Sequence, residues 1–309
     1  MAAGARLLGA MISVAAFYHF ADLADPVALR TPLVALAQSH GLRGSVLIAP
    51  EGVNGTIAGP AGGVDAALAH MRAWPGCRPL RAQRSSAGQM PFGRLKVRLK
   101  REIVTLGRPD IRPACGTGVR VAPAEWNALI TAPDVALIDT RNAYETRIGT
   151  FRGAIDPRLE RFGDFPAWWA AHGPRLANRR IAMFCTGGIR CEKSTALLRA
   201  EGVREVYHLD GGIMSYLARV PERDSLWQGE CFVFDRRVAL NHGLRPGRAV
   251  MCHACRHPVP ADATGTSGYE EGVSCPACLD RFTAADRARF RERHRQIGLA
   301  AARGARHLA

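Results

Sequence analysis

The segment RRIAMFCTGGIRCEKSTALLRAEG, residues 179–202, decides the fold of the middle of the chain. Its apolar run up to Cys185 predicts a buried β-strand, and its second half predicts a helix from Cys191 that Gly202 ends. Further strands are predicted at VALIDTR and EVYHLD, and a further helix at APAEWNALI. Buried strands that alternate with helices predict a parallel sheet covered on both faces. Catalytic groups of such sheets lie beyond the carboxyl ends of the strands, where Cys185 falls.

The loop after this strand predicts an anion cradle. Its glycines let successive backbone N–H groups turn inward, and the helix that follows adds its positive N-terminal end. The cradle consists of the backbone of Thr186, Gly187, Gly188 and Ile189. These dipoles and Arg190 predict a lowered pKa for Cys185, hence a thiolate at neutral pH, and they suit a sulfur anion such as a persulfide. The alternative is a buried structural cysteine, which two glycines and an arginine disfavour.

Residues 1–117 predict a ferredoxin-like (acylphosphatase-like) α+β domain with the order βαββαβ. ISVAAFYHF is strand-like, and Asp25 with Pro26 begins a helix that reaches about His40. GSVLIAP and GTIAG predict two strands joined by a turn at EGVNG. A second helix is predicted from Val64 to Trp74, and FGRLKVRLKREIV alternates as a last strand.

That last strand predicts a cationic face. Leu95, Val97 and Leu99 point one way, and the other face carries Arg94, Lys96, Arg98 and Lys100. These four cations are candidate RNA-binding residues, or they only solvate an exposed face.

Residues 107–118 are rich in Gly, Pro and Arg and predict a linker. We therefore expect three domains: residues 1–117, an α/β domain over residues 118–226, and a small Cys-rich module with a basic helical tail over residues 227–309. In that tail, five arginines alternate between Asp286 and Gln296, which predicts a helix that is solvated or binds a polyanion.

Two CxxC pairs with nineteen residues between them predict a structural zinc site. The expected ligands are Cys252, Cys255, Cys275 and Cys278. Four thiolates leave no open coordination position, so this metal folds the module. Redox-active dithiols are the alternative reading, and His253 and His257 are substitute ligands.

The composition limits the class of protein. The 309 residues carry a net charge of +15, which favours a nucleic-acid partner over an anionic membrane, although arginine-rich coding bias would give the same charge. Nine cysteines in a chain of this length favour metal and thiol chemistry in a reducing cytosol over a disulfide scaffold. No stretch has the length of a transmembrane span, and the N-terminus predicts a short extension rather than a signal peptide. We expect a cytoplasmic protein.

Several motifs resemble the rhodanese domain. CTGGIR resembles its active loop, and LIDTRNAYE, FRGAI and LDGGI resemble its other signatures in the family's order. Thr150 stands where rhodaneses commonly carry His. The related tyrosine-phosphatase-like loops place five residues between Cys and Arg, whereas four residues separate Cys185 from Arg190, which favours sulfur over phosphate.

A wider resemblance covers nearly the whole chain. APEGVNGT, KREIVTLG, CTGGIRCEKS, LDGGI and GECFVFDRRV together resemble the rhodanese-containing tRNA uridine 5-hydroxylase family. This resemblance implies oxygen-dependent conversion of uridine 34 of tRNA to 5-hydroxyuridine, with molecular oxygen as co-substrate and tRNA as partner. It makes Cys185 the catalytic, persulfide-bearing residue and Arg190 part of its cradle. No flavin or nicotinamide motif is seen, and the residues do not name the electron donor.

Supporting roles follow for residues near this loop. Asp139 and Arg141 are expected to brace it, and Glu145 and Asp210 are expected to brace it or to lie at the surface. Cys191 is either a partner thiol or simply packed.

In the N-terminal domain, the turn that the family shares carries two further candidates. Glu51 and Asn54 are candidate substrate contacts, unless Asn54 and Gly55 serve only the turn.

Two other functions are alternatives to hydroxylation. The first is a sulfurtransferase that carries sulfane sulfur on Cys185, and the second is a non-catalytic RNA-binding protein. Cys185 and Arg190 disfavour the second. The match outside the rhodanese domain disfavours the first, because a simple sulfurtransferase needs no such N-terminal domain.

Overall fold

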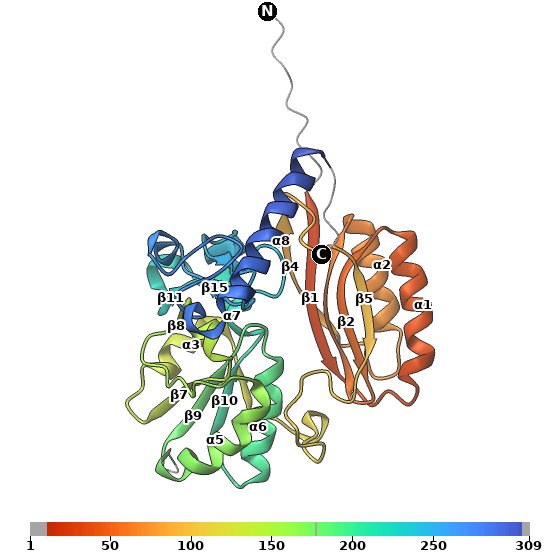
Figure 1. Ribbon diagram of the computed structural model, residues 1–309. Helices are drawn as coiled ribbons and strands as arrows, with labels where there is room; N and C mark the ends of the chain where they lie inside the picture. The colour runs from red at the N-terminus through yellow and green to blue at the C-terminus, as the bar shows by residue number, and fades with distance from the viewer. Residues whose placement is uncertain (1–10, 177, 305–309) are drawn as a thin grey trace, which may run out of the picture.

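The computed structural model describes residues 11–176 and 178–304 (Figure 1). They form an N-terminal lobe, a central lobe and a C-terminal module. The predicted N-terminal extension, residues 1–10, lies outside the described residues. Among the residues described, no helix combines the length and the apolar character that crossing a bilayer requires.

The N-terminal lobe has the predicted ferredoxin-like fold. Its elements are β1 (Ile12–Phe20), α1 (Pro26–Ser39), β2 (Arg43–Ala49), β3 (Gly52–Gly59), α2 (Ala61–Arg72), β4 (Arg81–Ala87) and β5 (Leu95–Leu99). The sheet order is β4-β1-β3-β2-β5. The first four strands pair antiparallel, and β5 joins the edge parallel to β2. The sequence did not predict β4, which completes the order βαββαβ, and the segment predicted as the last strand forms the additional strand β5.

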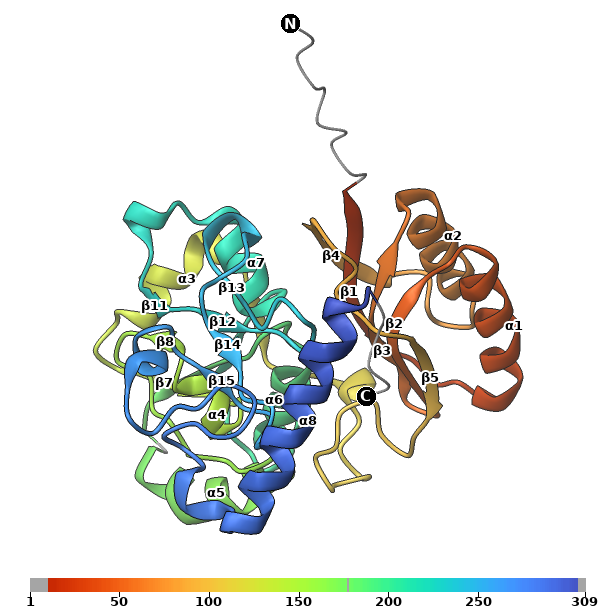
Figure 2. The same cartoon turned by 45° about the horizontal axis from the view of Figure 1, so that its top comes forward.

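Helix α1 begins as the sequence predicts. The Asp25 carboxylate accepts hydrogen bonds from the N–H groups of Val27 and Ala28, each at 3.0 Å, and Pro26 occupies the first turn. Helices α1 and α2 cover one face of the sheet, and the other face turns toward the central lobe (Figures 1 and 2). Successive side chains of β1 point to opposite faces of the sheet, and those of Ala15 and Phe17 lie in the core with the helices.

Two local predictions in this lobe are wrong. The turn at EGVNG is shorter, since β3 begins at Gly52, where φ is +140°. Asn54 therefore lies within β3 and pairs with both Tyr18 and Leu47, because strand pairing on both sides outweighs the turn preference of Asn-Gly. The predicted strand FGRLKVRLKREIV is limited to β5. Leu99 of β5 is 40% exposed, so fewer apolar side chains of this strand are buried than its alternating pattern predicts.

The central lobe is the predicted parallel α/β layer structure. Its elements are β6 (Val119–Val121), α3 (Pro123–Ile130), β7 (Val135–Asp139), α4 (Ala143–Thr146), β8 (Gly149–Phe151), α5 (Phe165–His172), β9 (Arg180–Phe184), α6 (Ile189–Ala200), β10 (Val206–Leu209) and α7 (Gly212–Arg219). Four strands form a parallel sheet in the order β6-β10-β9-β7.

Both faces of this sheet are covered. In β7, Ala136 and Ile138 pack into one core with α5 and α6. Val135 and Leu137 pack into the other core with α3 and α7. Burial on both faces explains why the strands are continuous apolar runs.

The predicted linker does not extend freely between the lobes. Ile111 is 5% exposed and packs in the core beneath α6, together with Leu106 just before the linker. The domain boundaries at residues 117 and 226 stay predictions.

The C-terminal module is built of short hairpins and one long helix. Its elements are β11 (Trp227–Gly229), β12 (Cys231–Phe232), β13 (Ala239–Leu240), β14 (Val250–Met251), β15 (Pro258–Val259) and α8 (Ala284–Ala302). Strand β11 pairs with β8 of the central lobe. Arginines of α8 bind the module itself: Arg291 pairs with Glu270, and Arg293 donates to the His253 carbonyl at 2.8 Å.

A buried lysine joins the two lobes. Lys193 of α6 is fully buried, and its ammonium lies 2.9 Å from the carboxylate of Glu51, between β2 and β3. It also binds Glu102 and donates to the Val104 carbonyl at 2.9 Å. The helix that follows the thiol loop therefore holds the N-terminal lobe in place.

Candidate active site

The reactive loop lies between β9 and α6, as predicted. The Gly188 N–H donates to the Cys185 sulfur at 3.1 Å, with Gly188 at a φ of +99°. The first turn of α7 holds the backbone of the loop, because the Ile213 N–H donates to the Cys185 carbonyl at 2.9 Å. A Cβ on Gly212 would lie 2.5 Å from that carbonyl, so the approach requires glycine.

The Cys185 thiol is acidic in this setting. Burial alone raises its pKa, but hydrogen bonds from Cys191, the charge of Arg190 and the Gly188 N–H outweigh burial and lower the pKa to about 5. Burial and the neighbouring Cys185 sulfur raise the pKa of Cys191 well above its ordinary value. The two thiols therefore hold one proton between them at neutral pH.

Arg190 does not point its guanidinium at the sulfur. It makes two parallel hydrogen bonds to the Glu145 carboxylate, at 2.6 and 2.9 Å, and a third to the Thr186 hydroxyl at 3.3 Å. Glu145 is itself fully buried. Arg190 thus acts on Cys185 through its charge, and Glu145 fixes its position.

Asp139 and Arg141 form a buried ion pair that is joined at 2.6 and 2.9 Å. Arg141 also donates to the Gly149 carbonyl, and the Thr150 hydroxyl donates to Asp139 at 2.9 Å. Arg141 reaches the Glu145 carbonyl at 3.5 Å. The pair therefore supports β8 and the α4 turn, and it also contacts Phe184, directly before Cys185: Asp139 pairs with Phe184 in the sheet, and the Arg141 guanidinium lies 5.9 Å from the centre of its ring.

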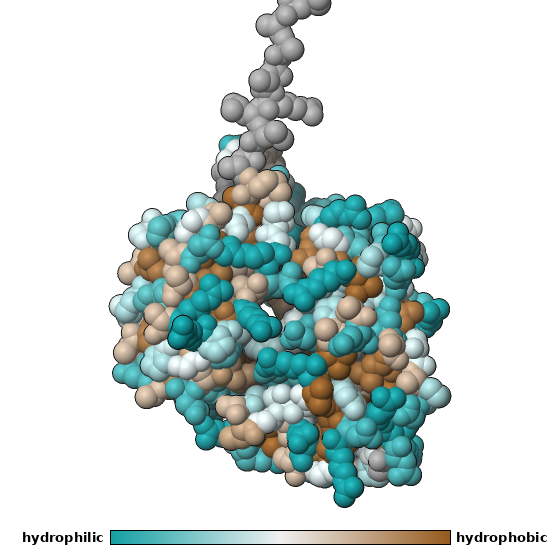
Figure 3. Space-filling model, turned by 180° about the vertical axis from the view of Figure 1, so that it is seen from behind, coloured by the Kyte–Doolittle hydropathy of each residue, from teal (hydrophilic) through white to brown (hydrophobic). Residues whose placement is uncertain are grey.

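A cleft of about 1020 Å³ opens between the two lobes. The thiol loop lines one side, with Cys185, Thr186 and Arg190, and the open face of the N-terminal sheet lines the other. Figure 3 shows a hollow between the lobes with hydrophilic side chains around it. Asp210 also lines this cleft.

The strand register turns the predicted cations toward the cleft. Lys96 and Arg98 pair with Ser45 and Leu47, which line the cleft, and residues paired in register share a face. Lys100 lines the cleft itself. Arg94 shares their parity but precedes β5, and its carbonyl accepts from Gly44.

Sequence reasoning missed Tyr18 and Glu192. The Tyr18 hydroxyl donates to Glu192 at 2.8 Å, and Arg120 donates to the same oxygen at 2.7 Å. A Cβ on Gly188 would lie 2.8 Å from the Tyr18 hydroxyl, so the N-terminal lobe touches the thiol loop itself. Burial and Glu192 raise the pKa of Tyr18, which keeps its hydroxyl protonated. The only sequence signal was the pair Glu192-Lys193 directly after the active loop.

Glu51 and Asn54 have positioning contacts. The Ile103 N–H donates to Glu51 at 2.6 Å, and the Asn54 amide donates to the Ile103 carbonyl at 2.9 Å. They hold the segment that follows β5. Asn54 also lines the cleft, so its predicted substrate contact stays a prediction.

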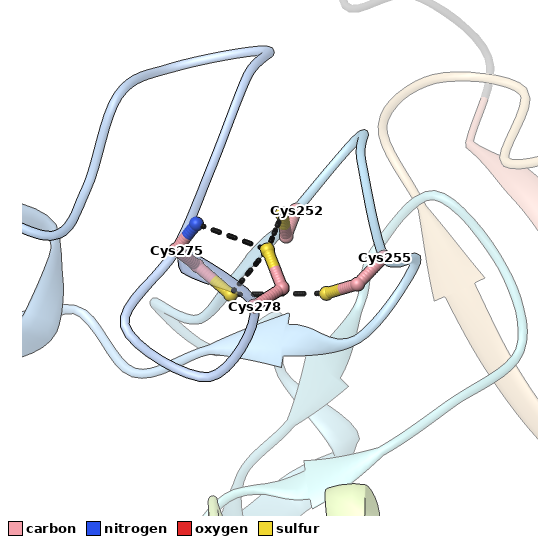
Figure 4. Close-up of side chains that lie close together, drawn as sticks. All are labelled: Cys252, Cys255, Cys275 and Cys278. Atoms are coloured by element: carbon pink, nitrogen blue, oxygen red, sulfur yellow. Dashed lines mark hydrogen bonds between the residues drawn. The ribbon is translucent and has the colours of Figure 1, made fainter. Parts of the chain in front are cut away.

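The four paired cysteines converge in the C-terminal module, apart from the thiol loop (Figure 4). Sulfur–sulfur distances are 3.9 Å for Cys252–Cys278, 3.7 Å for Cys255–Cys275 and 3.6 Å for Cys275–Cys278. A tetrahedral ion with metal–sulfur bonds of about 2.3 Å needs sulfurs about 3.8 Å apart. The donor set fits a four-coordinate thiophilic metal.

The fold and the loop thus define a rhodanese-type thiol site that faces an acylphosphatase-like domain. The sequence matches the UPF0176 acylphosphatase-like domain over residues 12–103 and the rhodanese-like domain over residues 122–219.

The chain is also similar to curated relatives over nearly its full length. It is 62% identical to the tRNA uridine(34) hydroxylase of Jannaschia sp. (strain CCS1), covering 96% of this chain and 99% of the relative. The identity is 55% to that of Roseobacter denitrificans, with 94% and 98% covered, and 54% to that of Gluconobacter oxydans, with 96% of each covered. The chain belongs to the tRNA uridine(34) hydroxylase family.

The acidity of Cys185 can be titrated directly. The ultraviolet absorbance of its thiolate, taken as the difference between the chain and Cys185→Ala, should appear with a midpoint near pH 5. In Cys191→Ala the midpoint should rise by about one to two pH units, because a hydrogen bond to a charged group is worth roughly 1.5–3 kcal/mol. Cys191→Ser keeps a donor and should titrate like the unaltered chain. A midpoint above neutrality in the unaltered chain would show that the loop does not ionise the thiol.

Proposed function

We propose that this chain hydroxylates carbon 5 of uridine 34 of tRNA, with molecular oxygen as co-substrate and Cys185 as the catalytic residue at the floor of the cleft. The observation that carries this proposal is the 62% identity, over 96% of the chain, to a relative named for that activity. The geometry supports it, because the buried, ionised thiol of Cys185 lies in the floor of a cleft large enough to take an extruded nucleotide.

The residues divide the work by position. Cys191, the charge of Arg190 and the Gly188 N–H keep the Cys185 sulfur anionic. Glu145 holds Arg190, and Asp139 with Arg141 supports the turn that carries Glu145. Tyr18 keeps a proton within the cleft beside Gly188. A persulfide on Cys185 would be held by the amides of the loop.

A sulfurtransferase remains the second candidate, and one observation favours it. The loop has four residues between Cys185 and Arg190, and it ionises its cysteine, as sulfane-sulfur transfer requires. A sulfurtransferase function does not explain why the N-terminal lobe docks closely against the thiol loop. The cytoplasmic location expected from cysteine usage stays a prediction.

The hydroxylase proposal is tested by nucleoside mass spectrometry of tRNA. Supplied to a host that lacks other routes, the chain should produce 5-hydroxyuridine at position 34, and Cys185→Ala should lower it to the host background. Cys77→Ala, at a buried thiol of the N-terminal core, is the matched control and should retain the product. Unmodified uridine with the unaltered chain, in the presence of tRNA and oxygen, would eliminate the activity. Thiocyanate formation from thiosulfate and cyanide, without any 5-hydroxyuridine, would select the sulfurtransferase.

We further propose that the cations of β5, Lys96 and Arg98, and Lys100 directly after it bind the tRNA backbone. Binding should weaken steeply with salt, because counterions are released from the phosphates. Lys100→Gln should reduce the slope of log affinity against log salt by about 0.7, the contribution of one contact to a single strand. Arg175→Gln, an exposed cation that does not line the cleft, is the control and should leave the slope unchanged. Equal slopes for Lys100→Gln and the unaltered chain would assign these cations to solvation.

We also propose that the four clustered cysteines hold one structural zinc ion. Elemental analysis should find one zinc per chain, and Cys275→Ser should lose it together with the protection of the module from proteolysis. The titration of Cys185 should persist in that variant, because the thiol loop is held by the central lobe. A zinc-free chain whose module resists proteolysis would refute a structural metal.

A further inference from the structure

Two thiols meet at the floor of the cleft. Cys185 directly follows β9, and Cys191 lies in the first turn of α6, close enough for each thiol to shift the pKa of the other. Both residues are fully buried in one core cluster. The other polar neighbour of Cys191 is the Thr140 hydroxyl at 3.5 Å.

The two sulfurs differ in access. Cys185 lines the cleft, whereas Cys191 does not and lies behind it. A reactant in the cleft therefore meets Cys185 before Cys191. This front-and-back arrangement is that of a nucleophilic and a resolving thiol.

The proposed hydroxylation has an unassigned requirement. Insertion of one oxygen atom of O₂ into the C5–H bond leaves the second atom to be released as water. That release consumes two electrons and two protons beyond those of the C–H bond. A thiolate and a thiol that close to a disulfide deliver both electrons and one proton, and solvent supplies the second proton.

We propose that Cys185 and Cys191 are this two-electron donor and cycle between a dithiol and a disulfide at each turnover. The inference rests on the proposed function. In each cycle, uridine C5–H, O₂, the Cys185 thiolate, the Cys191 thiol and one proton from solvent give C5–OH, one water and the Cys185–Cys191 disulfide. The C5–H bond, the Cys191 S–H bond and the O–O bond break, and the S–S, C–O and new O–H bonds form. A small dithiol then reduces the disulfide at the Cys185 sulfur, which faces the cleft.

The other thiols fit this role less well. Cys77 lies in the N-terminal core, and burial raises its pKa to about 11. Cys231 is fully buried, and burial raises its pKa to about 12. Four more belong to the cysteine cluster of the C-terminal module, and Cys115 is exposed and does not line the cleft. The shared proton of Cys185 and Cys191 gives one thiolate and one thiol, as disulfide formation needs.

The test is a single-turnover reaction without reductant. The holoprotein is reduced, freed of reductant, and mixed in air with excess tRNA carrying uridine 34. We expect product to stop at about one 5-hydroxyuridine per chain, with an equal amount of Cys185–Cys191 disulfide found by alkylation and peptide mass spectrometry. Addition of dithiothreitol should restart the reaction. The same tRNA with cytidine 34 should leave both thiols reduced, which separates turnover from oxidation in air.

Cys191→Ser is the decisive variant, because it keeps a hydrogen-bond donor beside Cys185 but cannot form the disulfide. It should titrate like the unaltered chain and yield at least about tenfold less product in the single turnover. Cys77→Ala, the matched control, should reach the full yield.

Product formed while Cys185 and Cys191 both stay reduced, or a full yield from Cys191→Ser, would overturn the dithiol proposal and leave the hydroxylase proposal standing. Absence of product from the unaltered chain, even with dithiothreitol, tRNA and oxygen, would refute the hydroxylase and this inference with it.

Discussion

The buried ammonium of Lys193 is the interaction on which the arrangement of the molecule depends. A fully buried charge must be paired, and here the partners are Glu51 and Glu102 of the N-terminal lobe. Removal of one partner from such a group costs roughly 3–5 kcal/mol, so the lobes have little freedom to separate. The adjacent Glu192 also joins the two lobes, because it accepts hydrogen bonds from Tyr18 of the N-terminal lobe and from Arg120. One helix therefore starts at the reactive loop and, one turn later, fixes the second wall of the cleft.

This coupling explains what the N-terminal lobe adds to a thiol loop. The loop alone would face solvent, where an ionised sulfur is accessible to any reagent. With the lobe docked, the sulfur lies in the floor of a bounded cleft whose far wall is a sheet face with cations along β5. Tyr18 reaches the loop from that wall. A polyanionic substrate is held by one lobe while the other presents the thiol, so recognition and chemistry come from different domains.

Much of this was predictable, because the signals are local. The strand–loop–helix around Cys185, the Asp25 cap and the two CxxC pairs each depend on neighbours in sequence. Glu192 and Lys193 were missed because a charged pair on a helix ordinarily indicates a solvated face, and their partners lie some 70 to 170 positions away in the chain. The turn at EGVNG was misplaced for the same reason, since the pairing of Asn54 with two strands outweighs its local preference.

The pairing of Arg190 with Glu145 bears on the substrate of the loop. An arginine that binds a phosphate dianion does so with the same two parallel N–H groups that here bind a carboxylate. The charge of Arg190 still lowers the pKa of Cys185. However, the two N–H groups that would bind a phosphate already bind Glu145, and Glu145 adds a negative charge beside the loop. What remains beside the sulfur is the Gly188 N–H and the Cys191 thiol. Such a site suits a singly charged sulfur adduct or an uncharged uracil ring better than a phosphate, which agrees with the four-residue spacing of the loop.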